Sequence, residues 1–213
     1  MKYDSIIFDL DGTLWDSCPS CAIGWNNVLQ RNNINFRNIT ADDVRSVAGK
    51  PHDDCIRTIF EGLDDKSIEI LIEQTSQEDN LLIKSFGGTI YEGVETGLKE
   101  LSAHCPLYIV SNCQDGYIET FLNFSGFHNF FKDYESWGRS RKSKCENLKL
   151  ISSRNHLLGP VYIGDTMGDF TSAKAAALPF IHVSYGFGSV PDAETFDSFS
   201  ALSRTLLKRL HTP

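Results

Sequence analysis

The first residues that could carry out chemistry are two aspartates near the start of the chain, in the sequence Asp9-Leu10-Asp11-Gly12-Thr13. They follow an apolar run, residues 5–8, which predicts a buried strand with a loop at its carboxyl end. The spacing suits a division of roles, because one carboxylate can attack phosphorus while the other handles the proton of the leaving group. Taken alone, the pair could merely stabilise a turn, since Asp-Gly sequences commonly do so.

Further polar residues follow later segments of the chain. Ser111 and Asn112 come after a second apolar run, Lys144 precedes an expected helix, and Asp165 and Asp169 lie in the motif at residues 164–169. Carboxylates packed closely repel each other and take up protons unless a cation neutralises them. Oxygen ligands with room for water suit Mg²⁺, while Ser111, Asn112 and Lys144 would supply donors and a positive charge to phosphoryl oxygens. Together these residues predict phosphoryl transfer through an aspartyl-phosphate.

Alternating short strands and helices are expected to bring these residues together. The pattern predicts strands at residues 5–8, 107–110, 130–134, 161–163 and 180–183, and helices at 94–104, 117–124, 146–155 and 170–177. Such alternation indicates an α/β fold with a Rossmann-like, mostly parallel sheet. Because the carboxyl ends of parallel strands meet at one edge, the candidate residues should converge there.

The segment after the first motif differs from the rest of the chain. It predicts helices over residues 17–30, 40–47, 51–60 and 64–82, and no strand between residues 14 and 84. Thr40 and Asp43 have the spacing of a capping box. We therefore expect an all-helical cap domain at residues 15–85, inserted into an α/β core formed by residues 1–14 and 86–213.

The motifs, in this order, resemble those of the haloacid dehalogenase (HAD) superfamily: Asp-Leu-Asp-Gly-Thr-Leu, then Ser-Asn, a later lysine, and Gly-Asp-Thr-x-x-Asp. The helical insert resembles the cap of its phosphoglycolate phosphatase and β-phosphoglucomutase relatives. The resemblance implies that Asp9 is the nucleophile and Asp11 the general acid and base. It also implies that Mg²⁺ is held by the Asp9 carboxylate, the Asp11 backbone carbonyl and Asp165, with Asp169 supporting the metal.

The same resemblance implies that Ser111 and a lysine bind the transferring phosphoryl group, and the chain offers two lysines. Lys144 lies four residues before Leu148, on the apolar face of the expected helix, whereas Lys142 is in register with Glu146 on the polar face. The periodicity therefore favours Lys144.

The cap is expected to be mobile and to select the substrate. Its second connection leads into Gly87 and Gly88, and paired glycines tolerate the backbone changes of a hinge. Lys50 lies in a tight break between two cap helices. In similar caps such a loop faces the site, so Lys50 could contact the non-reacting end of the substrate, although an ordinary turn with a solvated lysine is the alternative.

Composition limits the classes of function. The chain has 213 residues, a hydrophobic content of 41% and a formal net charge of −8. Such a charge argues against a nucleic-acid partner, and an anionic substrate would need local lysines or a metal ion to bind. No apolar run is long enough for a membrane span, and no secretory signal is evident, so a cytoplasmic location is expected.

The leading hypothesis is a Mg²⁺-dependent phosphatase acting on a small phosphorylated metabolite. A phosphomutase with the same core chemistry is the alternative, and a non-enzymatic phospho-accepting regulatory module fits the motif order less well. Cys18 and Cys21 form a C-x-x-C pair at a helix start, for which small buried residues are favoured over a redox role. The identity of the substrate and the oligomeric state are left open at this point.

Overall fold

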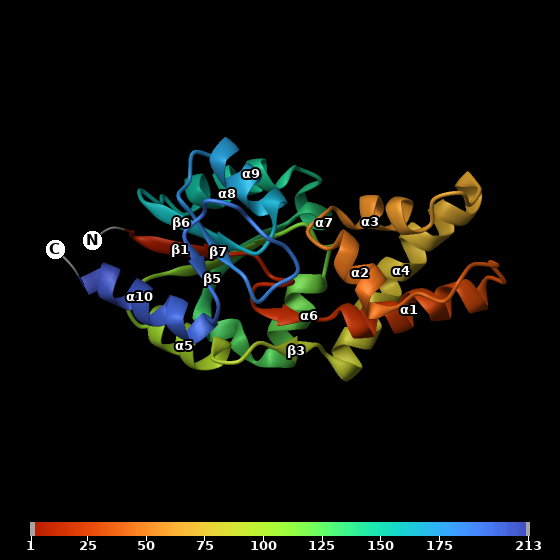
Figure 1. Cartoon of the computed structure of the whole chain (residues 1–213), viewed down its shortest axis with the longest axis horizontal. Helices are drawn as coiled ribbons and strands as arrows, with labels where there is room; N and C mark the ends of the chain where they lie inside the picture. The colour runs from red at the N-terminus through yellow and green to blue at the C-terminus, as the bar shows by residue number, and fades with distance from the viewer. Residues whose placement is uncertain (1–2, 212–213) are drawn as a thin grey trace.

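A six-stranded parallel sheet forms the centre of the computed structural model, which describes residues 3–211 (Figure 1). The strands occur in the order β5 (Phe131–Ser136), β4 (Leu107–Ser111), β1 (Ser5–Phe8), β6 (Pro160–Gly164), β7 (Phe180–Val183) and β8 (Thr195–Phe196). This arrangement confirms the expected α/β fold with a mostly parallel sheet. It places β1, which precedes Asp9, between β4 and β6.

Helices cover both faces of the sheet, which explains why the central strands read as continuous apolar runs. One face carries α5 (Val94–Ser102) and α10 (Phe199–His211), and the other carries α8 (Lys144–Arg154) and α9 (Met167–Ala175) (Figure 1). Successive residues of β1 point to opposite faces. Ile6 and Phe8 accordingly pack in the larger core cluster, which includes α5 and α10, whereas Ile7 packs in the cluster that includes α8 and α9. The shorter elements α6 (Tyr117–Ser125), η1 (Phe127–Phe130) and α7 (Trp137–Ser140) complete this part of the chain.

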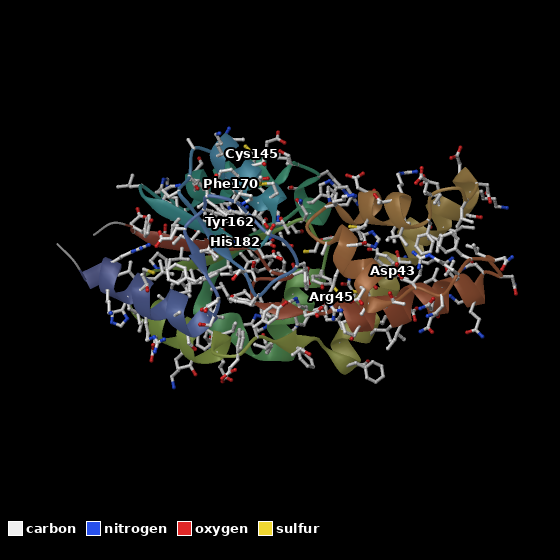
Figure 2. All side chains as sticks on the ribbon, viewed as in Figure 1. Asp43, Arg45, Cys145, Tyr162, Phe170 and His182 are labelled. Carbon is white, nitrogen blue, oxygen red and sulfur yellow. The ribbon has the colours of Figure 1, made fainter. Side chains whose placement is uncertain are left out.

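Four helices lie together beyond the carboxyl end of β1, and we call them the helical insertion (Figure 1). They are α1 (Cys18–Arg31), α2 (Ala41–Val47), α3 (His52–Ile59) and α4 (Asp65–Phe86). The expected capping box is present at α2, where Thr40 and Asp43 exchange hydrogen bonds. Asp43 and Arg45 mark this helix in Figure 2. Trp25 and Phe60 pack against each other, with ring centroids 6.0 Å apart, and give the insertion an aromatic core.

The expectation of no strand between residues 14 and 84 was wrong. Trp15–Asp16 forms β2, which pairs antiparallel with β3 (Thr89–Ile90), so the two chain segments that enter and leave the insertion are hydrogen-bonded to each other. A two-residue strand is too short to produce a periodic pattern, and its pairing joins segments far apart in sequence.

Two helices begin earlier than the apolar periodicity indicated. α8 begins at Lys144 rather than at residue 146, and α9 begins at Met167 rather than at residue 170. Both starts are set by capping boxes, formed by Ser143 with Glu146 and by Thr166 with Asp169. The Ser-x-x-Glu and Thr-x-x-Asp spacings were therefore the sequence signals that would have located these helix starts.

Within residues 3–211, no helix combines the length and apolar character needed to cross a membrane.

Candidate active site

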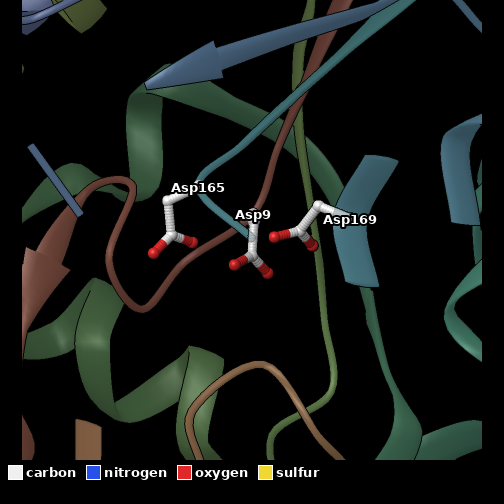
Figure 3. Close-up of side chains that lie close together, drawn as sticks. All are labelled: Asp9, Asp165 and Asp169. Atoms are coloured by element: carbon white, nitrogen blue, oxygen red, sulfur yellow. The ribbon is translucent and has the colours of Figure 1, made fainter. Parts of the chain in front are cut away.

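Three carboxylates meet at the carboxyl end of the sheet. Asp9 follows β1, Asp165 follows β6, and Asp169 lies in the first turn of α9. All three are buried, and one carboxylate oxygen from each lies within 4.8 Å of the others (Figure 3). The neighbouring positions of β1 and β6 in the sheet bring these residues together although they are far apart in sequence.

Lys144 touches two of these carboxylates. Its ammonium group donates to Oδ1 of Asp9 at 2.9 Å and to Oδ1 of Asp169 at 2.6 Å. Burial disfavours the charged lysine, but the two carboxylates outweigh burial and raise the pKa of Lys144. Lys142 is exposed, so the structure places the lysine favoured by helix periodicity in the cluster and the other in solvent.

Asp169 has donors on both carboxylate oxygens. Besides Lys144, the hydroxyl of Tyr162 donates to Oδ1 at 3.0 Å, while the amide and hydroxyl of Thr166 donate to Oδ2 at 3.0 and 2.6 Å. Burial would raise the pKa of Asp169, but Lys144 and these donors hold it below the usual value. Asp169 therefore stays ionised and is fixed in place by its neighbours.

Asp165 differs because one of its oxygens has no donor. Oδ2 accepts from the amide of Phe187 at 2.7 Å, but Oδ1 is buried without a hydrogen-bond partner among the described residues. Burial and the nearby Asp169 raise the pKa of Asp165 to about 7, and burial and Asp169 also raise the pKa of Asp9. Three carboxylates beside one ammonium leave two negative charges uncompensated when all are ionised, and the cluster therefore fits a divalent cation.

Gly12 allows the loop after β1 to approach Asp165. Its φ angle is +81°, and a Cβ atom on it would lie 2.1 Å from Oδ2 of Asp165. Both the backbone conformation and the space exclude a larger residue, which explains a glycine directly after Asp11.

Three donors converge on a single oxygen of Asp11. The hydroxyl of Tyr117 donates to Oδ1 at 2.7 Å, the indole of Trp15 at 3.0 Å and the hydroxyl of Ser17 at 3.1 Å. Burial outweighs these bonds and raises the pKa of Asp11 to about 6. Because Oδ1 is occupied by donors, a proton on this carboxyl group would reside on Oδ2. Sequence reasoning missed Tyr117 and Ser17, since nothing in their local pattern points to Asp11.

Ser111 and Asn112 lie at the end of β4, beside the same site. The hydroxyl of Ser111 accepts from the amide of Cys113 at 3.3 Å, and the side-chain amide of Asn112 donates to the carbonyl of Gly49 at 2.7 Å. Gly49 belongs to the loop between α2 and α3, so Asn112 joins the sheet to the helical insertion. The side-chain oxygen of Asn112 is buried and lacks a partner among the described residues.

A small cavity lies between the ends of the strands and the helical insertion. It offers about 70 Å³ to the centres of water molecules, which is room for only a few of them. Asp9, Asp11, Ser111 and Asn112 line it on one side, and residues of α1, α2 and α3 line it on the other. The candidate nucleophile and the candidate acid therefore face the same cavity.

The family of the chain follows from comparison with known proteins. The model of the haloacid dehalogenase-like hydrolases matches residues 6–183. The chain belongs to this family. It is 27% identical to a phosphoglycolate phosphatase of Rhodobacter capsulatus over 212 residues, which cover 93% of this chain and 94% of that protein.

Solved structures show the same fold. A predicted phosphoglycolate phosphatase from Haemophilus somnus 129pt superposes with a TM-score of 0.80 at 19% identity, covering 97% of this chain and 99% of that one. CbbY from Rhodobacter sphaeroides, solved in complex with xylulose-(1,5)bisphosphate, superposes with a TM-score of 0.79 at 15% identity, covering 94% and 96% of the two chains. The expected relationship is thus confirmed, and the chain is an enzyme, a HAD-like phosphatase. A non-enzymatic regulatory module does not agree with this result.

Lys50 of this HAD-like phosphatase lies at the rim of the cavity. It is exposed, and its ammonium group lies 3.4 Å from the hydroxyl of Thr58 on α3. The charged group thus points along the outer side of the insertion in this conformation, and a contact between Lys50 and the substrate stays a prediction.

Cys18 and Cys21 are buried and unpaired at the start of α1. Burial raises the pKa of both thiols, and the nearby Asp11 and Asp79 add to the effect at Cys18 and Cys21 respectively. Both are therefore neutral thiols at physiological pH, the form that is least reactive in redox chemistry.

Proposed function

We propose that this HAD-like phosphatase hydrolyses a small phosphomonoester in a Mg²⁺-dependent reaction that passes through an aspartyl-phosphate on Asp9. One observation carries the proposal: Asp9 and Asp11 face a single cavity, and Asp9 is surrounded there by Lys144, Asp165 and Asp169. Curated relatives named phosphoglycolate phosphatase make phosphoglycolate the first substrate to assay.

The acidic cluster is where we propose that Mg²⁺ binds. Asp165 supports this assignment because its buried Oδ1 has no donor among residues 3–211, and Asp9 would share the ion. Asp169, with donors on both oxygens, would act by fixing Lys144 and the start of α9. The Asp11 backbone carbonyl would complete the protein ligands. When bound, the ion would neutralise the carboxylates and the charge of the phosphoryl oxygens.

In the first step, a carboxylate oxygen of Asp9 attacks phosphorus, and the bond between phosphorus and the ester oxygen breaks. Asp11, protonated on Oδ2, gives its proton to the departing alkoxide, which leaves as an alcohol. Lys144 and Ser111 would donate to the phosphoryl oxygens, and Asn112 would support this side of the site.

In the second step, Asp11 takes a proton from water while the water oxygen attacks the phosphorus of the aspartyl-phosphate. The acyl-phosphate bond breaks, inorganic phosphate leaves, and Asp9 is restored. Tyr117, Trp15 and Ser17 keep Asp11 oriented in both steps by donating to its other oxygen.

We also propose that residues 15–85 form a cap domain over the core of residues 1–14 and 86–213. The hydrogen bond between Asn112 and Gly49 supports this assignment, because it joins the loop of the insertion to the edge of the site. Opening of the cap would admit substrate, and closure would exclude bulk water while Asp9 attacks phosphorus.

The test replaces Asp9 by Asn, which preserves shape but removes the nucleophile. We expect Asp9→Asn to show no turnover of phosphoglycolate or acetyl phosphate above background, and no phosphorylated protein by intact mass after acid quenching. Asp11→Asn should turn over slowly, and Asp54→Asn, an exposed aspartate on α3, should behave as wild type. Turnover by Asp9→Asn close to the wild-type rate would rule out the aspartyl-phosphate mechanism. Phosphate transfer back to substrate instead of release would identify the phosphomutase.

A further inference from the structure

The wall of the cavity that faces Asp11 is made of carbon and sulfur. It is formed by side chains from α1, α2 and α3 and from the loop after β4, all of them buried. These residues are Cys21, Trp25, Val44, Val47, Cys55 and Cys113. Burial raises the pKa of all three thiols, that of Cys55 to about 12, so each is neutral at physiological pH. We call this surface the apolar wall.

Polar groups next to the apolar wall are turned away from the cavity. Asp79 on α4, which is only 2% exposed and does not line the cavity, accepts from the indole of Trp25 at 3.2 Å and from the amide of Gln114 at 3.5 Å. Nε2 of His52 lies 3.8 Å from Asp79 and 3.1 Å from the hydroxyl of Thr75. The polar atoms of three lining residues therefore point behind the wall, toward Asp79.

Positive charge lies at the rim of the cavity and not on the apolar wall. Among the described residues that line the cavity, only Lys50 and His52 can carry a positive charge. The ammonium of Lys50 lies beside the neutral hydroxyl of Thr58 at the rim, and Nε2 of His52 lies 3.8 Å from Oδ2 of Asp79, behind the wall. A second anionic group held against the apolar wall would thus meet neutral side chains, and Lys50 could reach only an anion at the rim.

We infer that the apolar wall receives the leaving group of the substrate, and that this group is a neutral, apolar alkyl chain of a few carbons rather than a carboxylate-bearing one. The inference rests on the proposed phosphatase function and narrows its substrate class. The small volume of the cavity limits the chain length, and the three carbon side chains that α1 and α2 contribute to the wall, Trp25, Val44 and Val47, are each at most 7% exposed.

The first experiment compares two substrates of similar shape and opposite polarity. Isobutyl phosphate carries two methyl groups where phosphoglycolate carries the two carboxylate oxygens. We expect kcat/KM for isobutyl phosphate to exceed that for phosphoglycolate by roughly tenfold or more, because an unpaired anion in an apolar pocket loses its solvation. Equal values, or a preference for phosphoglycolate, would overturn the inference and leave the phosphatase function intact. Hydrolysis of neither compound, nor of acetyl phosphate, would overturn both.

The second experiment fills the cavity. Val47→Leu adds one methylene to the apolar wall, and we expect it to lower the ratio of kcat/KM for isobutyl phosphate to that for methyl phosphate by roughly tenfold. Val28→Leu adds the same group to a buried position on α1 that does not line the cavity, and it should leave the ratio unchanged. An unchanged ratio in Val47→Leu, or equal shifts of the ratio in both variants, would contradict the inference. If Val47→Leu does not fold, the comparison of isobutyl phosphate with phosphoglycolate on the wild-type enzyme decides the question.

Discussion

Lys144 occupies a position that would be unfavourable without its partners. It is the first residue of α8, where the helix dipole disfavours a positive charge, and it is buried. The two carboxylates that it contacts, Asp9 and Asp169, compensate both effects. A lysine held in this way is preorganised to donate to a phosphoryl group that arrives at Asp9.

We predict that Lys144→Ala lowers kcat by roughly a hundredfold or more, since a preorganised donor to the transferring group is lost. Lys142→Ala, two residues away and exposed, should change kcat less than twofold and serves as the control. Steady-state kinetics on acetyl phosphate measures both, with circular dichroism to verify folding. Turnover by Lys144→Ala close to the wild-type rate, with a large loss in Lys142→Ala, would contradict the assignment of Lys144.

Tyr117 is predicted to act by orienting Asp11. Tyr117→Phe removes the shortest of the three bonds to Oδ1, and we expect kcat/KM for an alkyl phosphate, which reports the first step alone, to fall roughly tenfold because the alkoxide is protonated less well. Acetyl phosphate, whose leaving acetate needs no proton, should be affected much less. Tyr108→Phe, on β4 and also buried, is the control. A merely structural role would lower both activities equally, and that result would exclude positioning.

The connections between the sheet and the helical insertion are restrained at several points. β2 pairs with β3, and the hydroxyl of Ser20 donates to the carbonyl of Gly87 at 2.7 Å. Gly87 has a φ angle of +67°, and a Cβ atom there would lie 2.0 Å from the ring of Phe124. A side chain added at Gly87 would therefore have to displace this ring.

We predict that Gly87→Ala lowers the melting temperature more than Gly62→Ala does. Gly62 also has a positive φ angle, +94°, but no atom lies within 4 Å of the position that a Cβ atom would take. The loss of stability in Gly62→Ala should therefore come from backbone strain alone, which costs about 1 to 2 kcal/mol. Gly87→Ala should lower the melting temperature by less when Phe124 is also replaced by Ala, because the added methyl group then no longer overlaps the ring. Equal losses at both glycines would mean that Phe124 does not restrict this segment.

Among residues 3–211, four buried aspartates have raised pKa values: Asp9, Asp11 at about 6, and Asp79 and Asp165 at about 7. Between pH 4 and pH 7 the unfolded chain releases these protons while the folded chain retains them. The folded state then binds more protons, so its stability falls as the pH rises through this window. A divalent cation bound at the acidic cluster would offset the loss of stability that ionisation of Asp165 causes.

We predict that in EDTA the melting temperature is lower at pH 8 than at pH 5. At pH 8, Mg²⁺ at a hundred times its dissociation constant should increase the free energy of unfolding by about 2.7 kcal/mol. This increase corresponds to a melting temperature that is higher by roughly 5–10 °C. Asp165→Asn should abolish most of this rise, and Asp54→Asn should not. Differential scanning calorimetry measures each value. A melting temperature that increases from pH 5 to pH 8 in EDTA, or an equal response to Mg²⁺ in Asp165→Asn, would contradict the prediction.

Local patterns in the sequence predicted the five longer strands, most of the helices and the order of the acidic motifs, but not the two-residue strands β2, β3 and β8. Apolar runs such as residues 5–8 and 161–163 are strands because burial on both faces requires continuous apolar residues, and this requirement is visible in the sequence. The convergence of Asp9, Asp165 and Asp169 follows from a parallel sheet, in which strand ends share an edge. The choice of Lys144 over Lys142 likewise followed from helical periodicity alone.

Only the tertiary structure decided which side chains orient the site and what the cavity presents. Tyr117 donates to Asp11 across 106 residues, Trp25 to Asp79 across 54, and Asn112 to Gly49 across 63. Each contact joins elements that are far apart in the sequence, and no periodicity within a single segment encodes how such elements pack. The orientation of the Trp25 and His52 nitrogens toward Asp79, and hence the apolar wall, arises in the same way. A buried carboxylate gathers the nearest donors from several elements, because leaving it without partners in the interior would cost more.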